Sequence, residues 1–431
     1  MNASPSVEEL LSLPLEAGKR VDPSTGKLAD DPDVSVSFEP IPVRRGDFVS
    51  SDIVPYRLHF YGPDLQHDLI YTYAYDSESN YLEYHPERSD PQWKTGMTEI
   101  LSDGYLRVEV LKNTSQKLNE LVSMAFDGDP NSRYSRPVFF REEDGRLKER
   151  LEKIRDEEDT VLLIAADSHY GFSPVYTDQI ADLQAAASIA RPDLFIHLGD
   201  LTDGALSGEK TKRFARRILR DLKSMGVPFE MCIGNHDFNY FKGNPDVFSR
   251  EECEQLYLDG KKEDRFVDLE DKHLRLIFLS SYDPKEKQRY GFYLKTAFRL
   301  WNMLRTTPKG YRILVFSHVP PLPEIHYWSQ EIRNSSYILR VLEQRQAVHH
   351  DILAYIHGHN HADQVYRARS FPIVGIGSMK PEYFTDKKPY GSETAMRAIG
   401  NRTQELFDVA VIKKDRIEFL RYGAGEDRTL T

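Results

Sequence analysis

The spacing of hydrophobic and polar residues changes near residue 150 and divides the chain into two regions. From about residue 50 to 113, apolar side chains alternate with polar ones, as at Tyr56, Leu58 and Phe60, and turn residues separate the runs. This spacing is typical of strands that bury one face. Residues 1–140 therefore predict a small, sandwich-like all-β domain. Before residue 50 we expect only a short helix at 7–13 and a strand at 34–38, because Pro, Ser, Asp and Gly are frequent there.

Three tyrosines of this region, Tyr71, Tyr73 and Tyr75, occupy alternate positions and so share one strand face. Tyrosine rings can stack on sugars, and they also serve as ordinary half-buried strand residues. Both interpretations stay open.

Beyond residue 140 the spacing becomes helical and then alternates between two kinds of element. Residues 141–160 are heavily charged, with Leu147, Leu151 and Ile154 at helical spacing, and predict a linker helix. Apolar runs then predict strands at 161–166, 193–198, 227–233, 274–279, 312–316 and 352–356. Amphipathic stretches predict helices at 176–190, 209–225, 296–305 and 335–348, and the tail, 405–422, predicts a hairpin. Residues 161–431 thus predict a second domain of the mixed α/β (α+β) class.

Composition excludes several kinds of protein. A net charge of -11 disfavours a surface that coats nucleic acid. The only cysteines, Cys232 and Cys253, provide neither a disulfide framework nor a cysteine zinc site. No apolar run reaches the ~18 residues of a membrane span. No basic segment followed by an apolar one opens the sequence, so we expect a cytoplasmic protein; if the chain is a piece of a longer one, secretion stays open.

Residue types that bind metal ions follow each of the key predicted strands. In chain order they are Asp167 and His169, then Asp200, then Asn235, His236 and Asp237, then His318, and finally His359 and His361. Ligands of open α/β sheets bind at the carboxyl ends of strands. Oxygen and imidazole donors suit Mn, Fe or Zn, and the absence of thiolates argues against a purely structural zinc.

Each of these motifs has an ordinary structural explanation when it is taken alone. Asp-x-His is commonly found on surfaces, Gly-Asp in turns, and His318 can simply end a strand. Five such motifs in order, each at a strand end, are hard to explain by chance. Four further histidines lie beside the motifs without matching them, and we expect them to be packing or surface residues: His197, His349, His350 and His357.

The series Asp-x-His, Gly-Asp, Gly-Asn-His-Asp, His and Gly-His-x-His resembles the calcineurin-like metallophosphoesterases over about residues 160 to 380. The resemblance implies two β-sheets sandwiched between helices, with two metal ions at the sheet edge. It implies that Asp167, His169 and His361 bind the first ion. It assigns Asn235, His318 and His359 to the second ion and makes Asp200 the bridge. His236 is then the general acid, oriented by Asp237.

The implied reaction is hydrolysis of a phosphomonoester or phosphodiester, in a small molecule or a phosphate-containing polymer, by a metal-bridging hydroxide. Asp203 stands where purple acid phosphatases carry a tyrosine, and Ile233 where phosphoprotein phosphatases carry an arginine. The layout is instead similar to bacterial metallophosphoesterases with an N-terminal β-domain. A proline-rich loop after His318 leads to Tyr327 and Trp328, which we expect either to contact a leaving group or to pack on the sheet.

The rival hypothesis is a glycan- or surface-binding protein. In that case the N-terminal β-domain is the functional part, and the phosphoesterase domain is a carrier. Degenerate carriers usually lose metal ligands, and none is missing here. The sequence therefore favours the enzyme, with a phosphoester as its partner, and disfavours nucleic acid as a partner.

Overall fold

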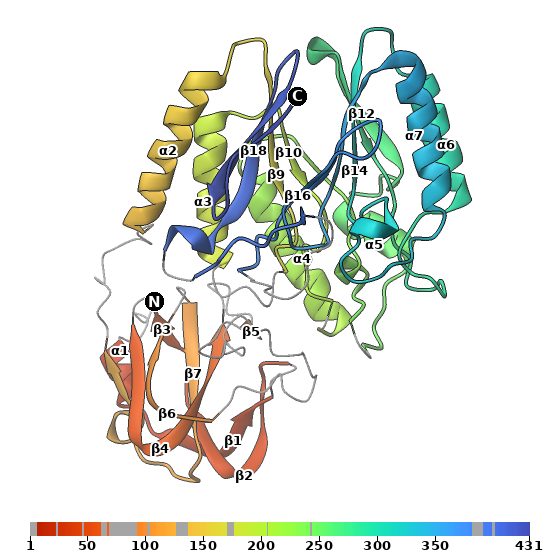
Figure 1. Ribbon diagram of the computed structural model, residues 1–431. Helices are drawn as coiled ribbons and strands as arrows, with labels where there is room; N and C mark the ends of the chain where they lie inside the picture. The colour runs from red at the N-terminus through yellow and green to blue at the C-terminus, as the bar shows by residue number, and fades with distance from the viewer. Residues whose placement is uncertain are drawn as a thin grey trace. The chain divides into compact units, whose positions relative to one another are not determined.

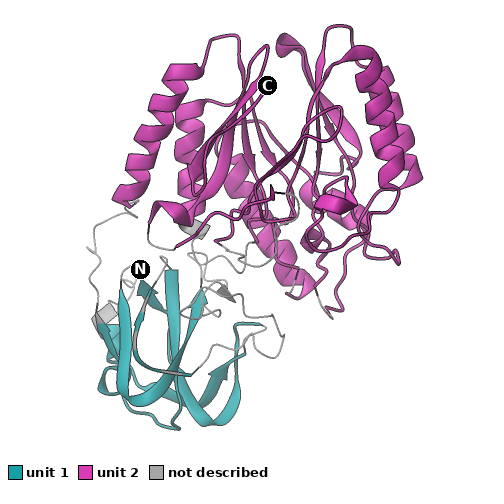
Figure 2. Cartoon of the chain, viewed as in Figure 1, with its two compact units in different colours: residues 1–136, 174–177 teal, residues 137–173, 178–431 magenta. Residues whose placement is uncertain are grey.

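The chain forms two compact units in the computed structural model, residues 1–136 with 174–177 and residues 137–173 with 178–431 (Figure 2). The structure describes residues 7–22, 25–44, 47–61, 67–68, 93–100, 104–125, 137–169, 176–204, 206–241, 244–381, 391–398 and 401–431. Within these ranges, no helix is both long enough and apolar enough to cross a bilayer.

The first unit is a β-structure with one short helix, α1 (Val7–Leu11). Its strands are β1 (Leu15–Val21), β2 (Leu28–Ser37), β3 (Ile41–Val43), β4 (Phe48–Tyr61), β5 (His67–Asp68), β6 (Lys94–Glu99), β7 (Gly104–Val110) and β8 (Ser123–Ala125). All are joined in a single antiparallel sheet, because the long β4 pairs with β6 and β8 through its first half and with β7 through its second. The β-rich region is confirmed, although hydrogen bonds link its strands into one sheet instead of two.

Before residue 50, the predicted helix at 7–13 and strand at 34–38 are found as α1 and the second half of β2, but the prediction that little else is regular there was wrong. Strands β1, β2 and β3 lie there, and β2 contains Pro32, which we expected to mark a turn. Pro32 is tolerated because the β1–β2 register shifts between the paired residues Asp30 and Ser35, so no ladder hydrogen bond needs its nitrogen. The tyrosines at 71, 73 and 75 lie outside the described residues.

The second unit contains two six-stranded sheets (Figure 1). The first has the order β11 (Phe229–Met231), β10 (Leu194–His197), β9 (Thr160–Ala165), β18 (Leu406–Ile412), β19 (Ile417–Gly423), β20 (Arg428–Leu430). The second has the order β12 (Arg265–Leu269), β13 (Leu274–Phe278), β14 (Arg312–Ser317), β15 (Ile352–His357), β17 (Ile373–Gly375), β16 (Gln364–Tyr366).

Helices cover the outer faces of both sheets. They are α2 (Val138–Ile154), α3 (Tyr176–Ala190), α4 (Gly208–Lys223), α5 (Arg250–Tyr257), α6 (Leu294–Arg305) and α7 (Ser335–His349). Figure 1 shows α2 and α3 beyond the first sheet and α6 and α7 beyond the second. The predicted fold class, two sheets sandwiched between helices, is confirmed.

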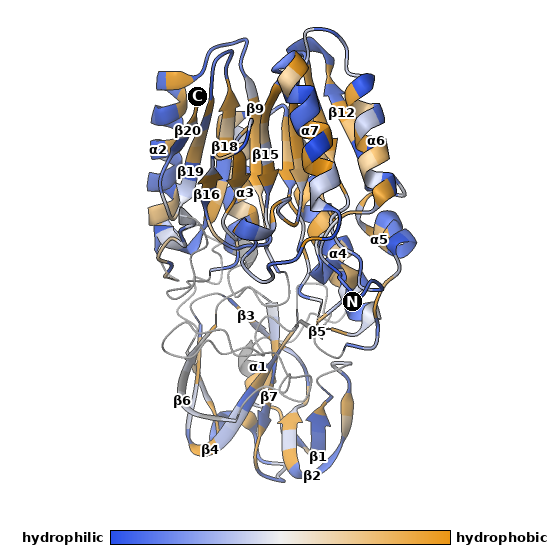
Figure 3. Cartoon of the chain, turned by 45° about the vertical axis from the view of Figure 1, so that its right-hand side comes forward, coloured by the Kyte–Doolittle hydropathy of each residue, from blue (hydrophilic) through white to orange (hydrophobic). Residues whose placement is uncertain are grey.

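The packing of the core explains why the strand sequences are continuous apolar runs. Leu162 and Ile164 of the first sheet share one buried cluster with Leu276 and Phe316 of the second, so the two sheets pack face to face. The other face of the second sheet packs on α6 and α7. Because inner strands such as β9 and β14 are buried on both faces, their residues are apolar without alternation (Figure 3).

Two segments take places that their sequences did not indicate. The predicted tail hairpin forms as β18 and β19, but β18 inserts into the middle of the first sheet, antiparallel to β9. Helix α2, expected as a linker, belongs to the second unit, where the Tyr422 hydroxyl of β19 hydrogen-bonds to Asp144 at 3.0 Å. Both placements depend on contacts between residues far apart in sequence.

Candidate metal centre

The carboxyl ends of five strands deliver the predicted ligands to one place. Strands β9, β10 and β11 run parallel in the first sheet, and β14 and β15 run parallel in the second. Asp167 and His169 follow β9, Asp200 follows β10, Asn235 follows β11, His318 follows β14, and His359 and His361 follow β15. Parallel strands bring such exit loops to a common edge.

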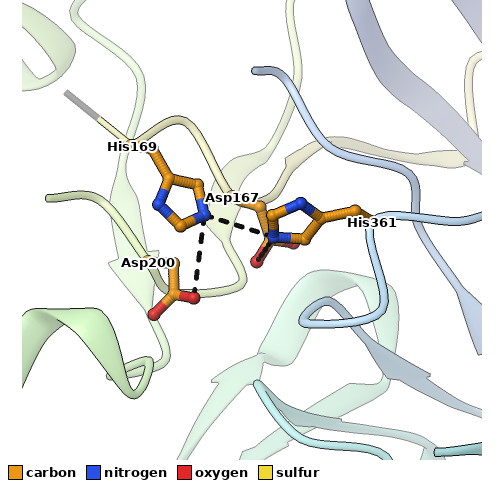
Figure 4. Close-up of side chains that lie close together, drawn as sticks. All are labelled: Asp167, His169, Asp200 and His361. Carbon is orange, nitrogen blue, oxygen red and sulfur yellow. Dashed lines mark hydrogen bonds and ion pairs between the residues drawn. The ribbon is translucent and has the colours of Figure 1, made fainter. Parts of the chain in front are cut away.

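Four of these side chains form a first group, with one ligand atom from each lying within 4.8 Å of the others (Figure 4). They are Asp167, His169, Asp200 and His361. The Nε2 atoms of His169 and His361 are 3.2 Å apart, and His361 Nε2 lies 3.3 Å from Asp167 Oδ1. His169 Nε2 lies 3.8 Å from Asp200 Oδ2.

A second group shares Asp200 with the first. Asp200, His318 and His359 also bring their ligand atoms within 4.8 Å of one another. His318 Nε2 lies 3.2 Å from Asp200 Oδ2 and 3.0 Å from His359 Nδ1. The amide oxygen of Asn235 lies 3.0 Å from the same His318 nitrogen. Among the residues that the structure describes, Asp200 is the carboxylate that the two groups share.

The donor set fits metal ions. All seven side chains are buried, and they offer only carboxylate oxygens, an amide oxygen and imidazole nitrogens. Three nitrogens or oxygens converge on His318 Nε2, which can satisfy only one of them by a hydrogen bond of its own. A cation at the centre of each group gives these lone pairs a common partner.

An unusual backbone conformation directs several of the candidate ligands toward the centre of the site. Five of the seven residues have a positive φ: 54° at Asp167, 46° at His169, 52° at Asp200, 66° at His359 and 51° at His361. Non-glycine residues seldom adopt this left-handed region, which costs of order 1–3 kcal/mol each. The sharp exits turn side chains from different strands toward one point.

Two glycines permit the close approach of the loops after β10 and β11. A Cβ on Gly234 would lie 2.1 Å from Asp200 Oδ1 and 2.2 Å from the Asp200 nitrogen. Gly199 has a φ of +97°, and its Cβ would lie 2.6 Å from the Gly234 nitrogen. Any larger side chain at either position displaces the backbone around Asp200.

Asp237 holds the same two loops together. Its carboxylate accepts hydrogen bonds from the backbone N–H groups of Gly234, Asp200, Leu201 and Thr202 at 2.9–3.1 Å. Burial and the charge of Asp200 raise its pKa to about 7, while the N–H donors lower it. Burial also lowers the pKa of His318, but the Asp200 carboxylate outweighs this and raises it to about 9.

The expectation that Asp237 orients His236 was wrong, because the Asp237 carboxylate accepts from backbone N–H groups and from the Thr202 hydroxyl. Instead, Nδ1 of His236 donates to the backbone carbonyl of Asp203 at 2.5 Å. The His236 ring lies 4.8 Å from the ring of His169 and 5.4 Å from that of Phe241. Sequence reasoning missed Asp203 because a backbone carbonyl gives no residue-type signal.

Aromatic side chains border the second group. The His326 ring stacks on His359 at 5.0 Å, and Tyr290 lies 5.0 Å from the same ring. The indole N–H of Trp328 donates to the His359 carbonyl at 2.8 Å. The proline-rich loop thus does reach the centre, whereas Tyr290 carries no motif that marks it. Tyr327 is held through its backbone N–H, which donates to the Asn360 side chain at 3.0 Å.

The four histidines predicted to be packing or surface residues, His197, His349, His350 and His357, contribute no ligand atom to either group. His197 and His357 are buried, and His197 Nδ1 accepts a hydrogen bond from the Gly199 N–H at 3.2 Å. His349 and His350 are exposed at the end of α7.

Comparison with known proteins gives one family. Residues 160–363 match the model of the calcineurin-like phosphoesterases. Among solved structures, the chain is similar to a dimetal phosphatase from Danio rerio, with 17% identity, a TM-score of 0.47, and coverage of 63% of this chain and 98% of that one. It is also similar to a putative 5'-nucleotidase from Staphylococcus aureus, with 13% identity, a TM-score of 0.37, and coverage of 63% and 54%. No curated protein sequence matches the chain.

Proposed function

Residues 160–363 belong to the calcineurin-like phosphoesterase family, and we propose on this basis that the protein uses two metal ions to hydrolyse a phosphomonoester or a phosphodiester. The observation that carries the proposal is the position of Asp200. Its carboxylate belongs to both groups of candidate ligands, which together with the neighbouring Asn235 come from five separate loops. Because no candidate ligand is missing, we favour an enzyme over a second unit that serves only to carry a binding N-terminal unit.

We assign one ion to Asp167, His169 and His361 and the other to Asn235, His318 and His359, with Asp200 between them. The distances within each group support this division, because Asp200 is the residue of the first group that also belongs to the second. Mn, Fe and Zn all accept this mixture of oxygen and imidazole donors. Two cations held there would lower the pKa of a water molecule and offset negative charge on the phosphoryl oxygens.

His236 is the residue that we propose to protonate the leaving oxygen. Its Nδ1–H donates to the Asp203 carbonyl, so a proton for the leaving oxygen comes from Nε2 of the doubly protonated, charged ring. Burial lowers the pKa of His236, while the Asp200 carboxylate and the Asp203 carbonyl oppose this by favouring the charged ring. Its ring stands against His169, beside the first group, and its backbone N–H donates to Asp200 Oδ1 at 2.8 Å. These contacts tie the acid to the same loops that hold the candidate ligands.

Trp328 and Tyr290 form the side of the centre on which we place the leaving group. Trp328 is 47% exposed, so part of its ring is available to a substrate. A planar or apolar leaving group gains the most from such a wall.

The test is an assay of the purified chain, loaded separately with Mn, Fe and Zn, against p-nitrophenyl phosphate, bis-p-nitrophenyl phosphate and a panel of cyclic nucleotides. We expect metal-dependent turnover of one ester class and its loss in Asp200→Asn. A chain that binds both ions and hydrolyses none of these esters would instead support the carrier hypothesis.

A further inference from the structure

The solvent-facing side of α6 is unusually apolar. Leu294, Phe298 and Trp301 follow one another at helical spacing and are 59%, 64% and 46% exposed. The opposite side of the helix is already in the core through Leu300 and Leu304. The three exposed residues therefore contribute nothing to the packing of α6 against its sheet, and water contact with them is unfavourable.

Helix α7 extends this surface. It lies beside α6 over the same sheet, so the solvent sides of both helices face away from that sheet (Figure 1). Its exposed side carries Tyr337, 48% exposed, and Val348, 71% exposed. Trp301 and Val348 line one hollow of about 720 Å³ between the helix ends. We call the exposed sides of the two helices the α6–α7 face.

Charge on this face is opposite to that of the whole chain. From residue 294 to 323 the sequence contains no Asp or Glu, although the chain as a whole has a net charge of -11. Lys295, Arg305 and Lys309 are exposed in this stretch, and Arg299, which is also exposed, is paired with Asp264 at 3.1 Å. Glu343, the only acid of α7, is paired with Arg369 at 3.1 Å. The α6–α7 face is thus basic on an acidic protein.

The apolar and basic side chains are interleaved. The rings of Phe298 and Trp301 stack with their centroids 6.0 Å apart, and the Arg305 guanidinium lies 5.4 Å from the Trp301 ring. Trp, Phe and Leu alternating with Lys and Arg is the composition of helices that lie in the interface of a bilayer. Trp is favoured at the level of the headgroups, and anionic lipids attract the cations.

Charge and shape select among the partners of such a face. A second copy of the chain, related by a twofold axis, would bring the same cations against each other. Nucleic acid would use the cations but would leave aliphatic side chains such as Leu294 and Val348 without a partner. We propose that the α6–α7 face docks the protein onto the surface of an anionic phospholipid bilayer. This inference does not depend on the proposed phosphoesterase activity.

The experiment is cosedimentation of the full chain with phosphatidylcholine vesicles prepared with and without phosphatidylserine. Phe298→Ser combined with Trp301→Ser removes apolar contact, and Lys295→Glu combined with Arg305→Glu reverses charge. The matched control is Val138→Ser combined with Lys148→Glu on α2, where the two residues are also exposed. The melting temperature and the turnover of a soluble p-nitrophenyl ester show whether each variant is folded.

We expect binding that requires phosphatidylserine. The apolar double variant should lose at least roughly tenfold in partitioning, and each removed cation should cost about fivefold, while the control binds like the unaltered chain. No binding by the unaltered chain, or equal binding by all variants, overturns the proposal. Binding of the chain to polyglutamate that is lost only in the charge-reversed variant also overturns the proposal, because this result would identify the partner as an acidic macromolecule. Self-association that is lost in the apolar variant overturns it in favour of a second copy.

Discussion

Gly234 sets how closely the loop after β11 can approach Asp200. A methyl group there would lie 2.1 Å from Asp200 Oδ1, so Gly234→Ala must move the carboxylate that faces both candidate ion sites. A displacement of about 1 Å in a catalytic group costs on the order of 100-fold in rate. We expect a loss of that size, with reduced metal content by elemental analysis. Gly145→Ala on α2 is the control, because nothing lies within 4 Å of its Cβ, and full activity loss there would point to a general effect of added methyl groups.

Substitution of His236 tests proton donation independently of metal binding. Because its ring is held by the Asp203 carbonyl and belongs to neither ligand group, His236→Asn should keep both ions. General acids typically contribute about 10²–10⁴-fold, and most when the leaving group is poor. The rate on alkyl phosphoesters should therefore fall far more than the rate on p-nitrophenyl esters. A uniform fall across leaving groups together with loss of one ion would make His236 a ligand.

Sequence alone identified residue types but not their neighbours. The seven candidate ligands were found because Asp, Asn and His follow predicted strands, and strand ends meet in this fold class. The partner of Asp237 was misassigned, since adjacency in sequence suggested His236 while the fold presents four backbone N–H groups. Tyr290 was missed because nothing in its local pattern differs from that of an ordinary loop tyrosine.

The Asp237 carboxylate holds together the two loops that follow β10 and β11. Asp237→Asn replaces two acceptor oxygens by one and turns N–H donors toward an amide NH2 group. Leaving buried donors unsatisfied costs about 1–3 kcal/mol each, so we expect the free energy of unfolding of the second unit to fall by roughly 2–4 kcal/mol. Urea unfolding measures this change. Asp415→Asn in the exposed β18–β19 turn is the control and should be neutral; equal effects at both sites would contradict the role of Asp237.

At the scale of whole elements, predictions were best where a segment is buried on both faces. Helix α3 begins and ends at the predicted residues 176 and 190, and β9, β13, β14 and β15 lie within one residue of prediction at each end. The position of β18 next to β9 was not predictable, because the pairing is set by contacts across more than two hundred residues. In the first unit, β1 and the first half of β2 were missed because their exposed residues are polar and lack a strong alternation, whereas the buried second half of β2 falls at the strand predicted at 34–38.

Across the whole molecule, the two units should respond differently to metal removal. Ions that bind only the folded second unit stabilise it by ~2.7 kcal/mol at a concentration 100 times the dissociation constant. A unit of this size changes its melting temperature by about 2–4 °C per kcal/mol, so chelation should lower that transition by roughly 5–10 °C. The first unit has its own core, and its described residues contain no candidate group of metal ligands, so its transition should not move. Scanning calorimetry with and without chelator compares the two, and a shift of both transitions or of neither would count against the site.

The central claim is that Asp200 is shared by two metal sites. The most direct measurement is the number of metal ions per chain, by elemental analysis, in the unaltered protein and in the variants Asp200→Ala, His361→Ala and His318→Ala. We predict two ions in the unaltered chain, one in each histidine variant and none firmly bound in Asp200→Ala, because only Asp200 belongs to both groups of side chains. A single ion in the fully loaded protein, or two ions retained by Asp200→Ala, would contradict this account.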